Sequence, residues 1–278
     1  MSSAVGGDVH IGGSGTPLVL LHGASSSWRA WQRLLPDLEA HYTVFAPTLG
    51  GHRGGPPLSV PRRQVVPGIV DVLRRQLDEA GIDTAHVVGN SLGGWVALEL
   101  ARLGRARSVV GLSPAGAWRT PTDLRRIVRL FRIGVRLGEW GAVRRLCEFG
   151  WARKIVMRSA TEHADRLTTA EVREIFEDMA GCVVLADLLD GASDAGPPAA
   201  FSRIDCPVRI VWGEHDRMLP FRRYGRPLLD AVPGAELVRL PGVGHVPMID
   251  DPAGVAHTIL EFVDRADREP NTGRKTDG

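Results

Sequence analysis

The stretch Gly89-Asn90-Ser91-Leu92-Gly93 places a serine between two glycines. A short apolar run precedes it and an apolar run with helical spacing follows it, so we predict a strand, a tight turn and a helix in that order. A sharp strand-to-helix turn raises a serine hydroxyl out of the fold, and glycines on both sides provide the space that this turn needs. We therefore predict that Ser91 is a nucleophile, with the first amides of the helix facing any negative charge that develops beside it.

Length and composition are typical of a globular protein with one large domain, or with a core that carries an insertion. The chain has 278 residues and a net charge of +2, which argues against a general nucleic-acid-binding protein. No apolar run approaches the ~20 residues that span a membrane. Residues 1–15 are small and polar without an apolar signal segment, so we expect a cytoplasmic location.

Short apolar runs alternate with helical patterns, which predicts an α/β fold with a mostly parallel sheet flanked by helices. In such a sheet, binding sites form where the carboxyl ends of strands meet loops. The predicted strands are Leu18–Leu21, Thr43–Ala46, His86–Gly89, Val109–Leu112, Val208–Trp212 and Glu236–Leu240. The predicted helices lie near Trp28–Ala40, Arg62–Ala80, Leu92–Leu103, Phe221–Ala231 and Pro252–Ala266.

The strand pattern is interrupted between residues 117 and 198, where we predict a helical cap inserted into the core. The core is then residues 1–116 and 199–268, and the polar residues 269–278 form a disordered tail. One cap helix is predicted to begin at Thr168, with Glu171 completing a capping box. Arginines share the first cap helix with its apolar stripe. We expect these arginines to face solvent; the alternative is that they form a positive rim that attracts anionic substrates. They are Arg125, Arg129, Arg132 and Arg136.

A serine nucleophile needs a base and an orienting carboxylate. His245 follows a predicted strand on a glycine-rich loop, which suits a proton-transferring imidazole, whereas its rival His22 is expected to fix a neighbouring loop. Asp216 follows another strand end and would hold the imidazole in the required tautomer. Glu214 lies too close to its strand end, and N-terminal capping of the last helix explains the remaining candidates, Asp250 and Asp251.

The oxyanion formed during acyl transfer needs two hydrogen-bond donors. We predict the backbone amides of Leu92, directly after the nucleophile, and of Ala24, in the loop after the first long strand. At least one of Ser25, Ser26 and Ser27 is expected to cap the helix that follows.

These segments together resemble the α/β-hydrolase superfamily over nearly the whole chain. The matching stretches are His22-Gly23-Ala24, residues 89–94, residues 213–216 and Gly244-His245. The resemblance implies an eight-stranded, mostly parallel sheet with a helical cap between its sixth and seventh strands. Only about seventeen residues precede Leu18, so we expect the first two, antiparallel strands to be short or incomplete. It also implies hydrolysis through an acyl-enzyme, without a metal or an organic cofactor.

Two departures from the family pattern bear on the reaction. Thr48 occupies the position where many members carry an aspartate, and the serine nucleophile argues against epoxide hydrolases and haloalkane dehalogenases. Asn90 is similar to members that cleave carbon–carbon bonds of ring-fission products, but the tryptophan that those enzymes tend to carry after the histidine is absent. Candidate pocket residues are Trp28, Asn90, Trp118, Phe131, Met218 and Met248.

The sequence thus predicts a serine hydrolase that acts on a small to medium, largely apolar ester, thioester or lactone. Carbon–carbon bond hydrolysis is one alternative. The other is a non-hydrolytic function, in which the same pocket binds a ligand or promotes a cyclisation. The substrate is a small molecule in each case, and the oligomeric state stays open.

Overall fold

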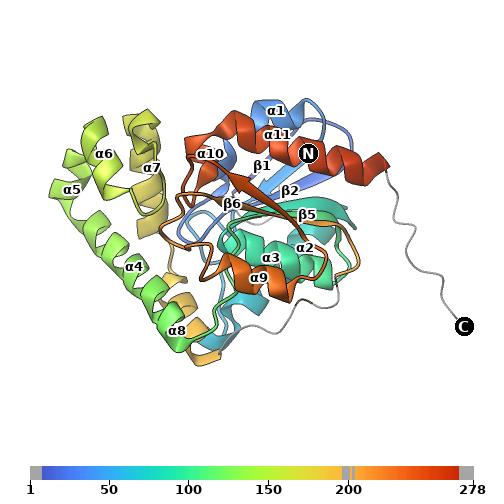
Figure 1. Cartoon of the computed structure of the whole chain (residues 1–278), viewed down its shortest axis with the longest axis horizontal. Helices are drawn as coiled ribbons and strands as arrows, with labels where there is room; N and C mark the ends of the chain where they lie inside the picture. The colour runs from blue at the N-terminus through green and yellow to red at the C-terminus, as the bar shows by residue number, and fades with distance from the viewer. Residues whose placement is uncertain (1–7, 196–200, 202–203, 269–278) are drawn as a thin grey trace, which may run out of the picture.

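The fold is built on one seven-stranded sheet in the computed structural model, which describes residues 8–195, 201 and 204–268 (Figure 1). The strand order is β1-β3-β2-β4-β5-β6-β7; β1 pairs antiparallel with β3, and the other pairs are parallel. All six predicted strands are confirmed. The strands are β1 (Val9–Gly12), β2 (Pro17–Leu21), β3 (Thr43–Pro47), β4 (Ala85–Asn90), β5 (Ala106–Leu112), β6 (Val208–Gly213) and β7 (Glu236–Leu240).

The expectation of eight strands is wrong for the described residues, which contain seven. A single antiparallel strand, β1, precedes β2, and it was not among the predicted strands. It lies at the edge of the sheet and none of its four residues is buried, so its sequence lacks the apolar run that marks the inner strands. The predicted tail, residues 269–278, lies outside the described residues.

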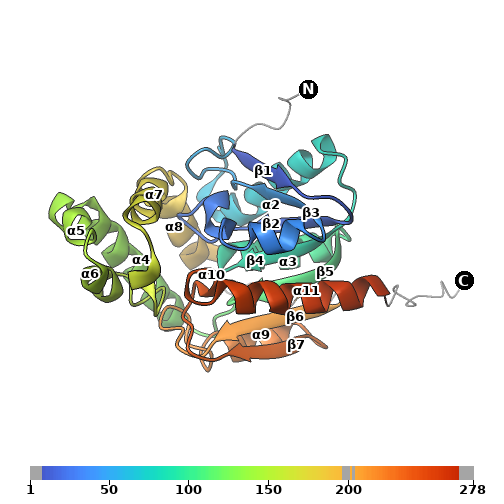
Figure 2. The same cartoon turned by 90° about the horizontal axis from the view of Figure 1, so that it is seen from above.

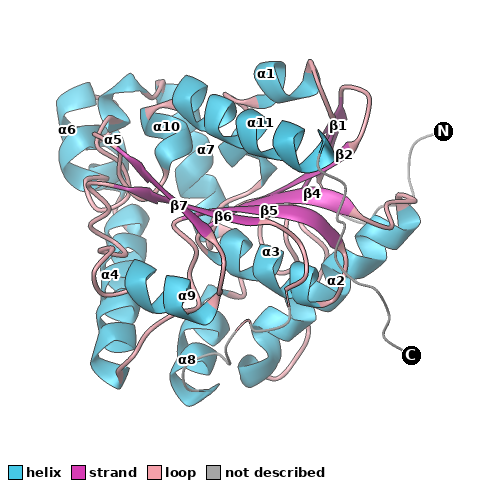
Figure 3. Ribbon diagram, turned by 45° about the vertical axis from the view of Figure 1, so that its right-hand side comes forward, coloured by secondary structure: helices cyan, strands magenta, loops and turns pink. Residues whose placement is uncertain are grey.

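Helices cover both faces of the sheet (Figure 3). Because side chains alternate along a strand, Leu18 and Leu20 of β2 pack with one helical layer, whereas Val19 and Leu21 pack with the other. One layer contains η1 (Trp28–Trp31), α1 (Leu35–Glu39) and α11 (Pro252–Arg268). The other contains α2 (Val65–Glu79), α3 (Leu92–Arg102) and α9 (Gly225–Ala231); η2 (Arg62–Gln64) leads into α2, and α10 (Pro247–Asp250) precedes α11.

The predicted helix near Trp28–Ala40 is divided into η1 and α1. Pro36 lies in the first turn of α1, where its missing N–H costs no hydrogen bond, whereas a continuous helix would require that bond. Ser27 caps η1 by accepting a hydrogen bond from the Arg29 amide, as predicted for one of the three serines.

The chain between β5 and β6 is helical, and we call residues 121–195 the helical insertion. Its elements are α4 (Pro121–Glu139), α5 (Gly141–Leu146), α6 (Gly150–Val156), η3 (Ala164–Arg166), α7 (Thr169–Ala180) and α8 (Leu185–Ala195). Thr168 and Glu171 form the predicted capping box of α7. The insertion lies at the end of the molecule towards which the parallel strands point with their carboxyl ends (Figures 1 and 2).

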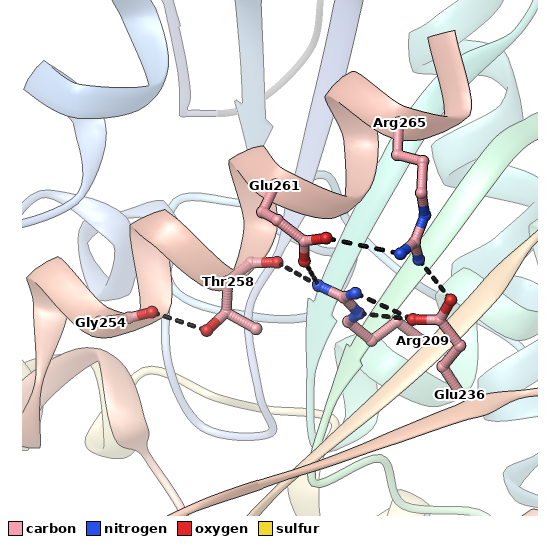
Figure 4. Close-up of polar contacts among 6 residues, drawn as sticks. All are labelled: Arg209, Glu236, Gly254, Thr258, Glu261 and Arg265. Atoms are coloured by element: carbon pink, nitrogen blue, oxygen red, sulfur yellow. Dashed lines mark hydrogen bonds and ion pairs between the residues drawn. The ribbon is translucent and has the colours of Figure 1, made fainter. Parts of the chain in front are cut away.

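A charged network joins the last two strands to α11 (Figure 4). Arg209 of β6 is buried and donates hydrogen bonds to Glu236 of β7, to the Thr258 carbonyl and to Glu261 of α11. Arg265 contacts both glutamates. The network attaches the C-terminal helix to the edge of the sheet. Within the described residues, no helix is long and apolar enough to cross a membrane.

Candidate functional site

Ser91 lies on a strained turn between β4 and α3. Its φ is 54° and its ψ is −113°, a left-handed conformation that a residue with a side chain rarely adopts. A Cβ on Gly89 would lie 2.2 Å from the Gly93 carbonyl oxygen, and one on Gly93 would lie 2.0 Å from the Leu21 carbonyl oxygen. Both glycines are therefore required because backbone segments touch around the serine, as the sequence pattern predicted.

His245 and Asp216 form a buried pair beside this turn. The His245 Nδ1 lies 2.8 Å from Asp216 Oδ2, and the other oxygen of Asp216 accepts the Leu219 amide at 2.7 Å. The carboxylate is fully shielded from solvent. With Nδ1 turned toward the carboxylate, Nε2 is the ring nitrogen left to accept a proton.

Two other acids can be set aside as orienting groups. The Glu214 side chain is exposed and accepts the Gly242 amide at 3.3 Å. Asp251 accepts the Gly254 amide at 3.0 Å, in the first turn of α11, which agrees with its predicted capping role.

The expectation that Asp250 also caps the last helix is wrong. Its carboxylate is 1% exposed and accepts hydrogen bonds from the Thr161 hydroxyl and from the amides of Glu162 and His163. It also accepts the Gly244 amide at 2.7 Å. Asp250 therefore joins the helical insertion to the loop that carries the neighbouring His245, and a nearby hydrogen bond from the Val246 amide to the Ala160 carbonyl reinforces this contact.

Two residues near Ser91 carry the backbone amides that were predicted to stabilise an oxyanion. Leu92 is the first residue of α3, and an amide at that position has no acceptor within its own helix. Ala24 lies in the loop after β2 and faces the same cavity as Ser91.

His22 fixes the loop that carries Ala24. Its Nε2 accepts the Leu49 amide at 2.9 Å, so Nδ1 carries the proton and donates to the Gly23 carbonyl at 2.8 Å. Complete burial, together with the neighbouring His52, holds the pKa of His22 well below its ordinary value. A neutral imidazole with both nitrogens engaged is a structural element, as predicted for this residue.

Ser91 and His245 line one cavity of about 230 Å³ between the sheet and the helical insertion. The core side of the cavity includes Gly23, Ala24 and Asn90. The insertion side is mostly apolar, with Glu171 among its polar residues, and Arg33 lines the cavity from the core. Of the residues on the insertion side, the sequence predicted only Phe131. The other apolar or small residues there include Leu130, Gly134, Val135 and Leu137 of α4, Val156 of α6, Met157, and Ile175, Phe176 and Met179 of α7.

Four of the six predicted pocket residues lie in this lining: Asn90, Phe131, Met218 and Met248. Trp28 and Trp118 do not. Trp28 stacks on His10 with ring centres 5.0 Å apart, and Trp118 is buried edge-to-face against Trp95. The sequence could not separate them from pocket residues, because a tryptophan that fills a core and one that lines a cavity have the same apolar neighbours in the chain.

Asn90 lines the cavity and also joins two loops by hydrogen bonds. Its amide group donates to the Leu112 carbonyl and to the His245 carbonyl, each at 3.0 Å. It therefore links the turn that carries Ser91 to the loop that carries His245.

Comparison with known proteins places this site in a family. The model of the alpha/beta hydrolase family matches residues 18–258, which is most of the chain. The chain belongs to the alpha/beta hydrolase family. Its sheet order, its helical layers and its turn at Ser91 are the features of that fold.

Relatives within the alpha/beta hydrolase family carry different names. The chain is 34% identical to an epoxide hydrolase, EphH, of Mycobacterium tuberculosis (strain ATCC 25618 / H37Rv), over 70% of this chain and 94% of that protein. It is 27% identical to 2-hydroxymuconate semialdehyde hydrolase of Pseudomonas sp. (strain CF600), over 94% of this chain and 91% of that protein. Among solved structures, a 2-hydroxy-6-oxo-6-phenylhexa-2,4-dienoate hydrolase from Rhodococcus sp. strain RHA1 aligns with a TM-score of 0.73 at 23% identity, covering 92% of this chain and 94% of that one. These hydrolase relatives support a hydrolase acting on a small molecule.

Proposed function

We propose that this hydrolase cleaves a carboxylic ester, thioester or lactone through a covalent acyl-enzyme on Ser91. The observation that carries the proposal is the buried His245–Asp216 pair beside a cavity that also contains Ser91 on its strained turn. The mostly apolar lining favours a small to medium substrate with an apolar acyl or alcohol part.

In the proposed reaction, the Ser91 hydroxyl attacks the substrate carbonyl carbon while His245 Nε2 takes its proton. The amides of Leu92 and Ala24 stabilise the oxyanion, and Asp216 stabilises the imidazolium. The imidazolium then gives its proton to the leaving alcohol or thiol. Water attacks the acyl-enzyme in the second half-reaction, with His245 again as the base. In this proposal residues 117–195 form a cap over the substrate cavity, and the last residues of the predicted cap, 196–198, lie outside the described residues.

Reaction with an organophosphonate probe tests the nucleophile. We expect the intact protein to be labelled at Ser91, Ser91→Ala to lose the label, and turnover of p-nitrophenyl esters to fall by at least about 10³-fold in the variant. Ser159→Ala is a matched control, because Ser159 also lines the cavity but lies away from the turn. A folded protein that ignores several such probes would refute the proposal.

The relative that is named an epoxide hydrolase makes epoxides the first competing substrate class to test. Attack by a serine on an epoxide carbon would leave an ether on the enzyme, and water cleaves an ether far less readily than an ester. An aspartate nucleophile avoids this, because it leaves an ester. Ser91 therefore favours acyl substrates, and multiple turnovers of an epoxide that require Ser91 would contradict this preference.

Carbon–carbon bond hydrolysis is the second candidate, favoured by the relative named 2-hydroxymuconate semialdehyde hydrolase. The Asn90 side-chain amide, the feature that suggested it in the sequence, donates to two backbone carbonyls, which accounts for this residue without a substrate contact. Loss of the absorbance of a dienoate ring-fission product, followed beside ester turnover in one preparation, separates the two reactions.

A further inference from the structure

The helical insertion carries a second apolar surface that does not belong to the cavity. Seven of the ten large apolar side chains that are exposed in the described part of the chain lie between residues 133 and 183. Five of these, which we call the outer apolar face, lie along residues 140–155 and are 41–64% exposed: Trp140, Leu146, Phe149, Trp151 and Ile155. α5 and α6 form the end of the molecule opposite the last turn of α11 in two perpendicular views (Figures 1 and 2).

The outer apolar face is separate from the apolar side chains that pack inside the insertion. α5 and α6 already supply Val143 and Val156 to a small internal cluster around Cys147 and Phe176. In α6, Trp151 and Ile155 are four residues apart and therefore share one side of the helix, and both are exposed. These short helices thus present apolar side chains both inward and outward, and the outward set needs another explanation.

The longer stretch from α4 to just beyond α6 is strongly basic. Residues 121–158 contain ten arginines and lysines but three acidic residues, a net charge of +7 in a chain whose total is +2. Residues 159–195, the rest of the insertion, contain two arginines and nine acidic residues, so the positive excess is confined to the part from α4 to the end of α6. Arg136, Arg145, Lys154 and Arg158 have no carboxylate partner among the described residues, and all four are exposed. Arg145 and Lys154 lie within residues 140–155 and Arg158 follows closely, so the outer apolar face shares its stretch of chain with free positive charge.

We propose that the outer apolar face docks onto a bilayer surface with anionic headgroups. Tryptophan rings favour the headgroup level, and arginine and lysine side chains rest their aliphatic parts on apolar surface while their charges reach lipid phosphates. A second copy of the chain fits this face poorly, because pairing would bring two strongly positive segments together.

Docking in this orientation would bring the cavity near the bilayer. α6 presents Trp151 and Ile155 outward, while Val156 at its end and the adjacent Met157 line the cavity. A substrate dissolved in the membrane would then reach the cavity along apolar surface. The docking itself requires none of the chemistry assigned to Ser91, so it stands independently of the proposed reaction.

Flotation of the full chain with phosphatidylcholine vesicles, with and without phosphatidylglycerol, tests the proposal. We expect binding to the anionic vesicles only, and weaker binding in high salt. Trp151→Ser with Ile155→Ser should abolish it, and Arg145→Glu with Lys154→Glu should weaken it more than tenfold, at about fivefold per charge lost. Matched controls are Ile11→Ser and Arg75→Glu, which change exposed side chains outside the insertion and should bind like the wild type.

Ser91→Ala should bind vesicles like the wild type, which separates docking from catalysis. Circular dichroism confirms that each variant is folded, and a blue shift of tryptophan emission on adding anionic vesicles gives a second measurement that needs no variant. The proposal is overturned if anionic vesicles do not bind, or if the control variants weaken binding as much as the others. A dimer that is lost in the Trp151 variant, with no vesicle binding, would assign the face to a second copy and overturn it equally.

Discussion

Asp250 is the residue whose function the sequence concealed most completely. Its neighbour Asp251 is a helix cap, and nothing in the chain distinguishes the two aspartates. Only the fold brings residues 161–163 and Gly244 around the Asp250 carboxylate, because these donors come from segments more than 80 residues apart in the chain.

Replacing Asp250 with asparagine should slow turnover without removing the chemistry. The amide group of asparagine cannot accept at both ends, so at least one buried donor loses its partner, at a cost of about 1–3 kcal/mol in unfolding free energy. The loop that carries His245 should shift, and kcat should fall by about 10- to 100-fold with a smaller change in KM. Ester kinetics and chemical denaturation measure both effects.

Asp251→Asn is the control for this prediction. Asp251 is exposed and caps α11, and asparagine caps helices nearly as well as aspartate. Equal losses of activity in the two variants would show that Asp250 has no special connection to the His245 loop.

Gly93 is required for a steric reason. Gly93→Ala would place a methyl group 2.0 Å from the Leu21 carbonyl oxygen, which a backbone cannot accommodate without moving. We expect loss of phosphonate labelling at Ser91 together with a destabilisation of more than about 2 kcal/mol. Gly141→Ala, at the first position of α5 with open space around it, should leave both properties intact. Full labelling of Gly93→Ala would contradict this account of the turn.

At the scale of elements, α7 is attached to the core by a charged pair. Both oxygens of Glu171 bind the Arg33 guanidinium, at 2.7 and 2.8 Å, while the carboxylate also completes the capping box with Thr168. Burial alone would raise the pKa of Glu171, but the hydrogen bonds from Arg33 and Thr168 outweigh it and lower the pKa to about 2.

This attachment should weaken in acid. Because the folded pKa of Glu171 lies below its unfolded value of about 4.5, its contribution to stability is complete above that value and is lost as pH falls toward 2. We therefore expect the thermal midpoint of the wild type to exceed that of Glu171→Gln at neutral pH, and the difference to shrink below about pH 4.5. A difference that is constant with pH would exclude the charged form of Glu171 as its cause.

The network around Arg209 attaches α11 to the last two strands. Its hydrogen bonds lower the pKa of Glu261, and together with Arg265 they lower that of Glu236 against the opposing effect of burial. Arg209→Met should reduce the free energy of unfolding by about 1–3 kcal/mol, because the half-buried Thr258 carbonyl and both glutamates lose a donor. Chemical denaturation measures this loss.

Arg265→Met provides the comparison, since it contacts the same glutamates from a more exposed position. Exposed ion pairs contribute little, so this variant should cost less than about 1 kcal/mol. A larger loss for Arg265 than for Arg209 would show that burial does not set the importance of the two arginines.

For the whole molecule, the sequence predicted the parts of the fold that local patterns determine. The inner strands were visible because both of their faces are buried and their residues are apolar, and the capping box at Thr168 was visible because its two members are three residues apart. Edge strand β1 lacks that apolar pattern. The break between α5 and α6 lies where Cys147 and its neighbours pack inside the insertion, which local sequence does not reveal.

The residues of the candidate site could likewise be predicted only where local sequence patterns mark them. Ser91, Asp216 and His245 could be named because each follows a strand, and the carboxyl ends of parallel strands converge at one edge. The cavity walls could not be named, because α4 and α7 contribute them through their orientation over the sheet. Helical spacing gives the apolar side of a helix but not the element that it faces.

The hydrogen bonds of Asp250 have a practical meaning for engineering. Exchanging the insertion between related enzymes is an obvious way to alter which molecules are accepted, and the natural cut sites would be the loops beside β5 and β6. Residues 160–163 fall inside such a graft, yet they help to seat the histidine loop of the recipient. A chimera that replaces residues 160–163 should have a new pocket but a displaced His245. A productive graft must therefore keep this short stretch from the protein that receives the insertion.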